Sequence, residues 1–123
     1  MYKKKILIIE DEAGLVETVK FRLEANNYEV ITADNGEEGL DKARREKPSL
    51  VLLDLMIPRI DGHEVCRLLK SDEKYKDIPI IIFTARAGED DEKLASEAGA
   101  NDYITKPFES KELLFRIEGL LKN

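Results

Sequence analysis

Five polar residues stand at the ends of short stretches with strand character, where they could act together on a phosphate group. They are Glu10, Asp11, Asp54, Thr84 and Lys106. Each has an ordinary structural interpretation, because aspartates cap helices, threonines favour strand ends and lysines are mostly solvated surface charges. Brought to one place, however, carboxylates, a hydroxyl and an ammonium group form a set suited to binding a cation and a phosphoryl group.

The spacing of apolar residues predicts alternating strands and helices that would position these groups. Continuous apolar runs such as Lys5–Ile9 and Leu50–Leu53 are typical of strands buried on both faces of a parallel sheet. Asn35 offers an N-cap with Glu38 three residues later, and Pro48 ends the helix that follows. We predict strands at residues 5–9, 28–33, 50–53, 78–83 and 102–105, and helices at residues 13–25, between 35 and 48, and at 62–69, 91–98 and 110–121.

About five strands alternating with about five helices indicate a doubly wound α/β sheet in a single domain. We see no linker, internal repeat or low-complexity segment. Periodicity does not distinguish the two common strand orders of such sheets, but both place ligands at the carboxyl ends of the strands. The five polar groups are therefore expected at the same edge of the sheet.

At that edge, Asp11 and Asp54 would repel each other unless a hard cation lay between them, and an all-oxygen ligand set suits Mg²⁺ or Mn²⁺. The same cation could neutralise a phosphoryl group, while Lys106 paired with its oxygens and Thr84 donated a hydrogen bond. A carboxylate would then be the nucleophile and form an acyl phosphate. Asp54 is the better candidate, because it ends the most apolar strand, whereas Glu10 and Asp11 are consecutive and point in different directions.

The sequence lacks the residues that characterise other proteins acting on phosphate groups. The glycine-rich loops of nucleotide hydrolases and dinucleotide-binding proteins are absent, since Gly36, Gly39 and Gly62 are isolated. Phosphatases that attack with an aspartate commonly carry a general acid two residues later, where this chain has Met56. We therefore expect slow release of a phosphoryl group to water.

Composition sets further limits. A net charge of −6 argues against direct nucleic-acid binding, which depends on clustered lysine and arginine. The apolar runs are much shorter than the roughly 20 residues that span a bilayer, and no cleavable signal pattern follows Met1, so we expect a cytoplasmic protein without membrane association. We interpret the single Cys66 as a core residue, and the single His63 as a surface or helix-end residue rather than a metal ligand.

Four motifs in order resemble response-regulator receiver domains of two-component signalling, and the match covers nearly the whole chain. They are Glu10-Asp11-Glu12, Asp54-Leu-Met-Ile-Pro58 followed by Asp61-Gly62, Phe83-Thr84-Ala85, and Tyr103-Ile-Thr-Lys106-Pro107-Phe108. The resemblance implies that residues 1–123 form one receiver domain. It also implies a CheY-like, flavodoxin-like sheet with strand order 2-1-3-4-5 and helices on both faces.

The resemblance implies roles for the acidic residues. Asp54 would be the phosphoacceptor, and Mg²⁺ would be held by Asp11, Asp54 and the backbone carbonyl of Met56. Glu10 would help, through water. It replaces the aspartate that the family often has at this position.

The resemblance also implies a phosphoryl site and a switch. Lys106 and Ala85 would contact the phosphoryl group, and the peptide bond before Pro107 would be cis. Thr84 would move toward the phosphoryl group and Tyr103 would turn inward behind it, altering the face made by the fourth helix, fifth strand and fifth helix. Such a domain catalyses its own phosphorylation and slow dephosphorylation and is not a turnover enzyme.

The implied partners are a sensor histidine kinase or phosphotransfer protein, and an output partner or domain controlled through that face. The segment from Asp102 onward is similar to receivers of the OmpR/PhoB type, which dimerise through salt bridges, and Asp102 and Arg116 match their pattern. Glu92 stands where that group usually has a basic residue facing Glu112. In any homodimer formed on phosphorylation, a like-charge pair would therefore replace an attractive one.

Two alternatives remain. A receiver-fold interaction module that is never phosphorylated would be expected to lack the acceptor aspartate, the lysine or the acidic pair, and all of these are present. A metal-dependent phosphatase acting on free substrates would need a general acid and a substrate pocket, and neither is visible in the sequence. The phosphorylated switch is the leading interpretation.

Overall fold

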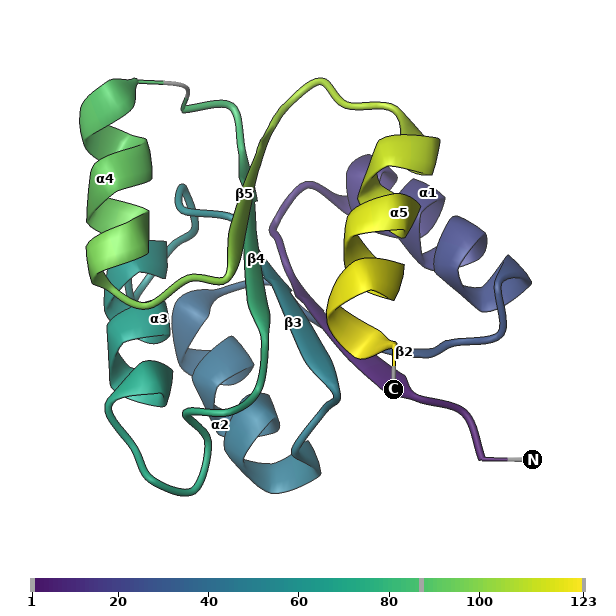
Figure 1. The fold of residues 1–123 in the computed structure, drawn as a ribbon, viewed down its shortest axis with the longest axis horizontal. Helices are drawn as coiled ribbons and strands as arrows, with labels where there is room; N and C mark the ends of the chain where they lie inside the picture. Colours follow the sequence, from purple (N-terminus) through teal and green to yellow (C-terminus); the bar gives the residue numbers. More distant parts are fainter. Residues whose placement is uncertain (1, 87, 123) are drawn as a thin grey trace.

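Strands and helices alternate along the chain as predicted in the computed structural model of the protein, which describes residues 2–86 and 88–122 (Figure 1). The strands are β1 (Lys5–Ile9), β2 (Glu29–Ala33), β3 (Leu50–Leu53), β4 (Ile80–Thr84) and β5 (Asp102–Thr105). The helices are α1 (Ala13–Ala25), α2 (Gly36–Glu46), α3 (Gly62–Lys70), α4 (Glu89–Glu97) and α5 (Ser110–Leu121). All strand pairs are parallel and the order is β2-β1-β3-β4-β5, which confirms the doubly wound sheet.

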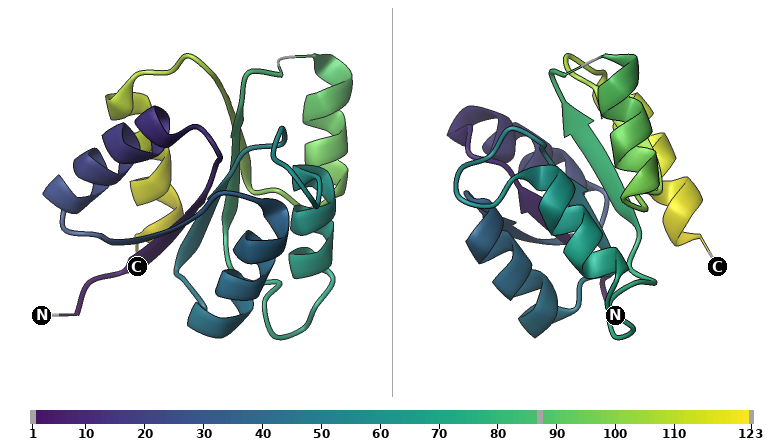
Figure 2. Two further views of the ribbon diagram at one scale, coloured as in Figure 1. Left: turned by 180° about the vertical axis from the view of Figure 1, so that it is seen from behind. Right: turned by 90° about the vertical axis from the view of Figure 1, so that its left-hand side faces the viewer.

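Two layers of helices cover the sheet, with α1 and α5 on one face and α2, α3 and α4 on the other (Figures 1 and 2). Because successive strand residues point to opposite faces, each apolar strand contributes to both layers. Leu7, Ile9 and Val51 pack in the core beneath α2 and α3, whereas Ile6 and Ile8 pack in the core beneath α1 and α5. Burial on both faces explains why the strand sequences are continuously apolar.

Four predicted elements have different ends in the structure: β2 begins and α3 ends one residue later than predicted, and β4 and α4 differ at both ends. The fourth strand was expected at residues 78–83, but β4 runs from Ile80 to Thr84. Pro79 lacks an N–H group and only its carbonyl bonds to β3, accepting from the Val51 amide at 3.0 Å. The fourth helix was expected at 91–98, but α4 begins at Glu89 and ends at Glu97, with four acidic residues in a first turn that the helix dipole favours.

The N-cap and the C-terminal end of α2 have the structure that the sequence predicts. The Asn35 side chain accepts a hydrogen bond from the Glu38 amide at 2.8 Å, and the Glu38 carboxylate accepts from the Asp34 amide at 3.2 Å. The helix ends at Glu46, and its C-cap Lys47 has a left-handed φ of 45° immediately before Pro48. Capping and termination of α2 are therefore confirmed.

Cys66 is fully buried in α3, which confirms its interpretation as a core residue. Its thiol lies 3.7 Å from the carbonyl oxygen of Ala98, just beyond α4. Burial raises the pKa of the Cys66 thiol to about 11. Because the thiolate is the reactive species, this cysteine is chemically inert in the folded protein.

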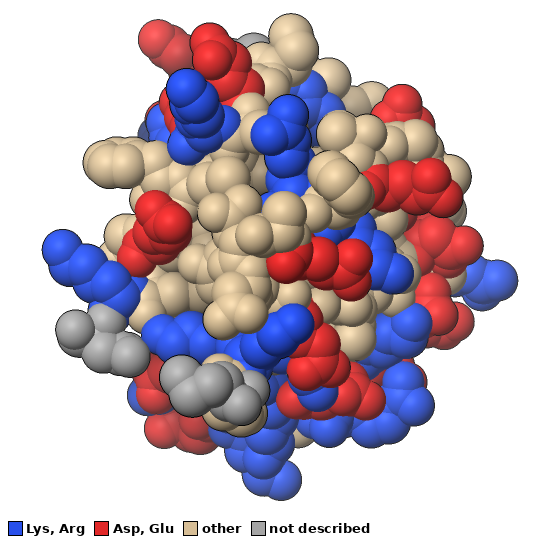
Figure 3. Space-filling model, turned by 90° about the vertical axis from the view of Figure 1, so that its right-hand side faces the viewer, with Lys and Arg blue, Asp and Glu red and all other residues tan. Residues whose placement is uncertain are grey.

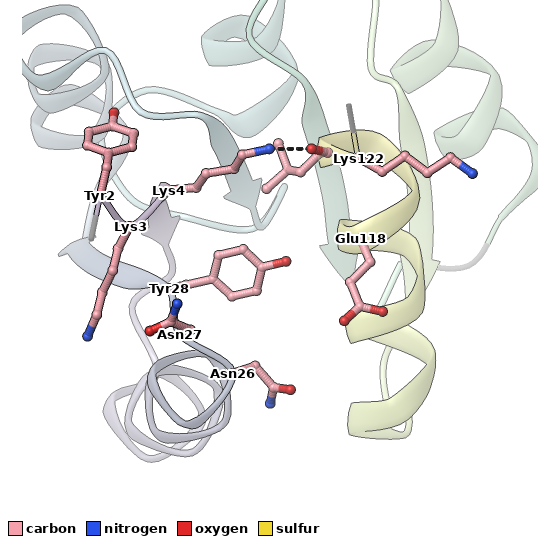
Figure 4. A pocket seen from close by; sticks show the side chains of 9 residues that line it. Tyr2, Lys3, Lys4, Asn26, Asn27, Tyr28, Glu118 and Lys122 are labelled. Carbon is pink, nitrogen blue, oxygen red and sulfur yellow. Dashed lines mark hydrogen bonds between the residues drawn. The ribbon is translucent and has the colours of Figure 1, made fainter.

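The surface away from the strand ends has two notable features. On the face that carries α1 and α5, acidic and basic side chains surround a central area of uncharged residues, and neither sign of charge dominates (Figure 3). A hollow of about 340 Å³ lies at the amino end of the sheet, where the Lys4 ammonium donates a hydrogen bond to the carbonyl of Leu121 (Figure 4). Among residues 2–86 and 88–122, no helix is both long and apolar enough to cross a bilayer.

Two glycines hold the loop between β3 and α3 against its neighbours. The Gly36 amide donates to the Pro58 carbonyl at 3.1 Å, and a Cβ at Gly36 would lie 2.0 Å from the Ile60 carbonyl oxygen. A Cβ at Gly62 would lie 2.6 Å from the Asp54 carbonyl oxygen. The backbone that follows Asp54 is thus packed too closely for any side chain at these two positions.

We expect Gly36→Ala to lower the free energy of unfolding in urea by about 1–3 kcal/mol, because the added methyl group overpacks the contact with Ile60. This loss would occur although alanine is intrinsically favoured in helices. Gly119→Ala in α5 is the matched control, since apart from its own helix backbone no described residue places an atom within 4 Å of its Cβ position, and we expect a gain of about 0.5–1 kcal/mol. Equal stabilisation of both variants would contradict the close packing at Gly36.

Candidate active site

The pairing of β1 with β3 places the first two acidic positions side by side. Ile9 and Leu53 are register partners, and the Asp54 amide donates to the Ile9 carbonyl at 3.0 Å. The residues that follow each strand, Glu10 and Asp54, therefore leave the sheet at the same point. This is where the chain order reverses between β1 and β3, the usual ligand position in a doubly wound sheet.

Three carboxylates gather at this point. Glu10, Asp11 and Asp54 each offer a carboxylate oxygen, and these three atoms lie within 4.8 Å of one another. Glu10 and Asp54 are only 2% and 5% exposed, whereas Asp11 is exposed. Because like charges at such distances repel strongly when buried, the cluster is an arrangement that a cation would stabilise, with access from the side of Asp11.

Lys106 supplies a positive charge to this cluster. Its ammonium group donates to Asp54 Oδ2 at 3.1 Å and also to Glu10 Oε1. The same nitrogen lies 5.0 Å from the centroid of the Phe83 ring, so the ammonium is held over an aromatic face as well as between two carboxylates. The Lys106–Pro107 peptide bond is cis, as expected.

Burial and the ion pair between Glu10 and Lys106 shift the pKa values of both residues. Burial raises the pKa of the Glu10 carboxyl, and the charge of Asp54 adds to this rise, although Lys106 and the Glu12 amide act in the opposite direction. Burial lowers the pKa of the Lys106 ammonium, but its hydrogen bonds to Glu10 and Asp54 outweigh this effect, and the net pKa lies above the ordinary value. Lys106 is therefore charged at neutral pH.

Backbone amides orient the two buried carboxylates. Glu10 Oε2 accepts from the Glu12 amide at 3.1 Å, which leaves Oε1 facing Lys106. Asp54 Oδ1 accepts from the Met56 amide at 3.1 Å, which leaves Oδ2 facing Lys106. The Met56 side chain is 56% exposed and points to solvent, so this residue takes part in the site through its backbone.

Thr84 ends β4 and Ala85 follows it at the same edge of the sheet. Thr84 is fully buried, and its hydroxyl accepts a long hydrogen bond of 3.4 Å from the Arg86 amide. The Thr84 carbonyl accepts from the Lys106 amide at 2.8 Å, which fixes the backbone of the lysine to β4. Ala85 is exposed at the bend beyond the strand.

Tyr103 is not part of the carboxylate cluster. It lies on β5, and its hydroxyl donates a hydrogen bond to the Arg86 carbonyl in the segment between β4 and α4. Tyr103 and Thr84 thus contact the same residue, Arg86, from two strands. The Arg86 side chain in turn pairs with Asp91 in α4 at 2.8 Å.

Asp102 and Arg116, which match the pattern of the dimerising receivers, form an ion pair within one chain. Arg116 Nη1 donates to Asp102 Oδ1 at 2.6 Å and to the Tyr103 carbonyl at 3.1 Å. Arg116 Nη2 donates to Glu112 at 3.0 Å. This network fixes α5 to β5, and Glu92 lies exposed on the first turn of α4.

Three contacts of the site were not predicted from the sequence. Phe83 lies beneath Lys106, the Glu12 amide orients Glu10, and the Arg86 backbone links Thr84 to Tyr103. Phe83 was identified as the end of an apolar strand and as part of a motif, without a role of its own, and the other two contacts use backbone atoms. Backbone contacts leave no signature in residue type.

We expect Lys106→Met to lower the free energy of unfolding by about 2–3 kcal/mol in buffer without divalent cations, because Glu10 and Asp54 would remain buried without an opposite charge. Combining it with Glu10→Gln should recover about 1 kcal/mol, since the two residues contact each other directly. Urea denaturation of the wild type, both single variants and the double variant measures this coupling. Strictly additive effects would show that the ion pair contributes nothing to stability.

Comparison with known proteins assigns the chain to a family. The family model for the response regulator receiver domain matches residues 6–118. The chain is 44% identical over 119 residues to the alkaline phosphatase synthesis transcriptional regulatory protein PhoP of Bacillus subtilis, covering 97% of this chain and 49% of PhoP. It is 43% identical over 122 residues to the phosphate regulon transcriptional regulatory protein PhoB of Pseudomonas aeruginosa, covering 99% of this chain and 53% of PhoB.

A solved structure of a receiver domain shares the fold. The crystal structure of the receiver domain of sensor histidine kinase PA1611 from Pseudomonas aeruginosa, with a magnesium ion coordinated in its active site cleft, is 28% identical and superposes with a TM-score of 0.91, covering 99% of this chain and all of that one. The chain spans about half the length of the curated relatives that it matches. On the family match and these identities, the chain belongs to the response regulator receiver domains and is similar to those of OmpR/PhoB-type regulators.

Proposed function

We propose that residues 1–123 act as one receiver domain in which Asp54 accepts a phosphoryl group in a Mg²⁺-dependent reaction. The donor would be a histidine kinase, a phosphotransfer protein or a small phosphodonor. The observation that carries this proposal is the placement of a buried Asp54 between two further carboxylates and the ammonium group of Lys106. This is the charge distribution that phosphoryl transfer requires.

The donor atoms at the site fit Mg²⁺. Glu10, Asp11 and Asp54 offer carboxylate oxygens only, and the described part of the chain places no nitrogen or sulfur ligand among them. Hard cations such as Mg²⁺ prefer oxygen ligands and retain water, which the exposure of Asp11 permits. We assign the metal to Asp11, Asp54 and the backbone carbonyl of Met56, with Glu10 acting through water. The bound ion would neutralise charge on the phosphoryl oxygens.

In the proposed reaction, an oxygen of Asp54 forms a bond to phosphorus as the bond from phosphorus to the donor breaks. When a phosphohistidine is the donor, the departing electron pair stays on the imidazole nitrogen and the product is an acyl phosphate. Lys106 exchanges its contacts with Glu10 and Asp54 for the phosphoryl oxygens, and the Thr84 hydroxyl and the Ala85 backbone donate to the others. Met56 cannot take a proton from an attacking water molecule, so hydrolysis of the acyl phosphate is slow.

The contacts of Arg86 suggest how phosphorylation reaches the surface. Movement of Thr84 toward the phosphoryl group breaks its long hydrogen bond with the Arg86 amide and shifts the segment that also holds the Tyr103 hydroxyl. Among the residues of α4, Ala95 alone is buried, so this helix can move at small energetic cost. Tyr103 would then turn inward and the α4-β5-α5 surface would change.

The altered α4-β5-α5 surface would control an output partner or domain. PhoP and PhoB are regulators about twice the length of this chain, which supports an output partner or domain that responds to the α4-β5-α5 surface. With a net charge of −6, the receiver itself is not proposed to bind nucleic acid. The switch acts by exposing a new surface and not by turnover of a substrate.

The first prediction concerns covalent modification of the protein. Incubation with acetyl phosphate or phosphoramidate and Mg²⁺ should give one phosphoryl adduct by intact mass spectrometry. The adduct should be lost with Asp54→Asn and without Mg²⁺, because the nucleophile or the neutralising charge is then missing. Asp34→Asn is the matched control, since Asp34 follows β2 at the same edge but lies outside the carboxylate cluster. No adduct with Mg²⁺ present would favour the interaction module that is never phosphorylated.

The second prediction separates the switch from the chemistry. Thr84→Ala should still accept a phosphoryl group, because Asp54 and Lys106 are unchanged. Addition of beryllofluoride, a phosphoryl mimic, should shift the amide resonances of Tyr103 and α4 in the wild type and leave most of them unshifted in this variant. Thr18→Ala removes a hydroxyl that donates to the Gly14 carbonyl within α1 and should respond like the wild type. Full shifts in the Thr84 variant would exclude this residue as the link.

The third prediction concerns dimerisation. Glu92 in one copy would face Glu112 in the other, so Glu92→Lys should make the beryllofluoride-bound protein dimerise about tenfold more tightly, as two exposed pairs of about 0.5–1 kcal/mol become attractive. Analytical ultracentrifugation measures the dissociation constant. Glu97→Lys makes the same charge change on the α3 side of the helix and should have no such effect. Equal gains in both variants would indicate a general effect of net charge.

A further inference from the structure

Two kinds of contact hold the Lys106 ammonium in the structure. It donates hydrogen bonds to Asp54 and Glu10, and it lies 5.0 Å from the centroid of the Phe83 ring. In the proposed reaction the ammonium leaves both carboxylates for the phosphoryl oxygens. The ring is uncharged and binds neither the metal ion nor the phosphate, so its attraction for the ammonium can persist throughout the reaction.

The Phe83 ring is fixed in place. Phe83 is fully buried in β4, where Ile104 on β5 is its register partner. It belongs to the core beneath α1 and α5 together with Leu113, and the centroid of the Phe108 ring lies 6.0 Å from its own. Because a close-packed core leaves a large side chain little freedom, Phe83 offers a surface at a constant position.

The Lys106 side chain lacks such a constraint of its own. The Lys106 amide donates to the Thr84 carbonyl at 2.8 Å, which fixes the backbone, but a long flexible stem separates the backbone from the ammonium. The side chain is only 20% exposed. The attraction between a cation and an aromatic face is stronger in such a partly desolvated position than in open water. The ring therefore restricts where the ammonium can lie.

An aromatic residue is unusual within this strand. β4 has the sequence Ile-Ile-Ile-Phe-Thr, and all of its residues are buried. Aliphatic, β-branched residues suit a buried strand, as the first three positions show. The one aromatic residue of β4 is the residue beneath the ammonium. What the ring adds to the burial that an aliphatic side chain would also achieve is a face of negative potential.

We propose that Phe83 is a positioning residue for phosphoryl transfer, whose ring face holds the Lys106 ammonium beside Asp54 while the ammonium changes partners. Under the proposed function, on which this role rests, Phe83 acts through Lys106 and not on the phosphoryl group itself. A charge that is already in position stabilises a transition state without reorganisation at the moment of reaction. A loosely held Lys106 would therefore slow the transfer.

Fluorination of the ring tests this role without altering the core. Fluorine atoms withdraw electron density from the face of a phenyl ring and change its size little, so the attraction for a cation weakens step by step. Phe83 would be replaced by phenylalanine analogues that carry one, two or three ring fluorines. With phosphoramidate and Mg²⁺, the logarithm of the rate of adduct formation should fall with each fluorine, to a rate of about one tenth with three. A rate that does not depend on fluorination would overturn the proposal.

The same analogues at Phe108 are the matched control. Phe108 packs beside Phe83, but the ammonium lies over the Phe83 ring. We expect three fluorines at Phe108 to change the rate by less than about twofold, because the contact with the ammonium is preserved. Equal slopes at the two positions would indicate a general effect of fluorine on the core and would also overturn the proposal.

Lys106→Met tests whether the ammonium is the group on which the ring acts. Methionine keeps a flexible apolar side chain and removes the charge. Phosphorylation of this variant should be slower, and the remaining rate should no longer depend on fluorination at Phe83, since the two changes remove the same interaction. The same dependence on fluorine in both backgrounds would show that the ring acts by packing alone.

A spectroscopic measurement detects the contact without phosphorylation. Lys106→Met should shift the fluorine resonance of a singly fluorinated ring at Phe83 more than that of the same probe at Phe108, because the charge lies over the first ring. No larger shift at Phe83 would refute the contact. Absence of an adduct in the wild type would refute the proposed function, whereas a normal adduct with a flat fluorine series would refute the role of Phe83 alone.

Discussion

The repulsion among three carboxylates at the end of β1 and β3 is the interaction on which the rest of the structure depends. Neither Glu10 nor Asp54 can move away, because each follows a strand that is almost wholly buried and hydrogen-bonded to its neighbours. Two backbone amides and the ammonium of Lys106 therefore have to balance the negative charge. A receiver domain built in this way holds an excess of negative charge at one edge of its sheet, which a bound cation would relieve.

The two sides of the site differ in how firmly they are held. The β1 and β3 side is fixed by the core and by the close packing at Gly36 and Gly62. On the other side, Arg86 is held through a long hydrogen bond, a tyrosine hydroxyl and an ion pair to a helix that buries only Ala95 among its described residues. Under the proposed function, a rigid acceptor beside a weakly held segment would let a local change of charge alter a distant surface without loss of the fold.

Much of this could be predicted from the sequence, because buried parallel strands leave continuous apolar runs and their carboxyl ends must meet. That reasoning placed Glu10, Asp11, Asp54 and Lys106 together correctly. It misplaced the start of α4, whose first turn is acidic and carries no apolar pattern. It also missed the Arg86 backbone contacts and the buried ring nitrogens of His63, which have no hydrogen-bond partner within residues 2–86 and 88–122. Backbone bonds and the approach of two helices depend on tertiary packing that residue type does not record.

The buried thiol of Cys66 gives this protein an internal reporter of its own fluctuations. The thiol lies against the Ala98 carbonyl at the end of α4 and reacts only as a thiolate that burial suppresses. Separation of α4 from α3 would admit both water and a thiol reagent. The rate of labelling under native conditions would therefore count the openings of this one helix pair, much as hydrogen exchange counts the openings of individual amides.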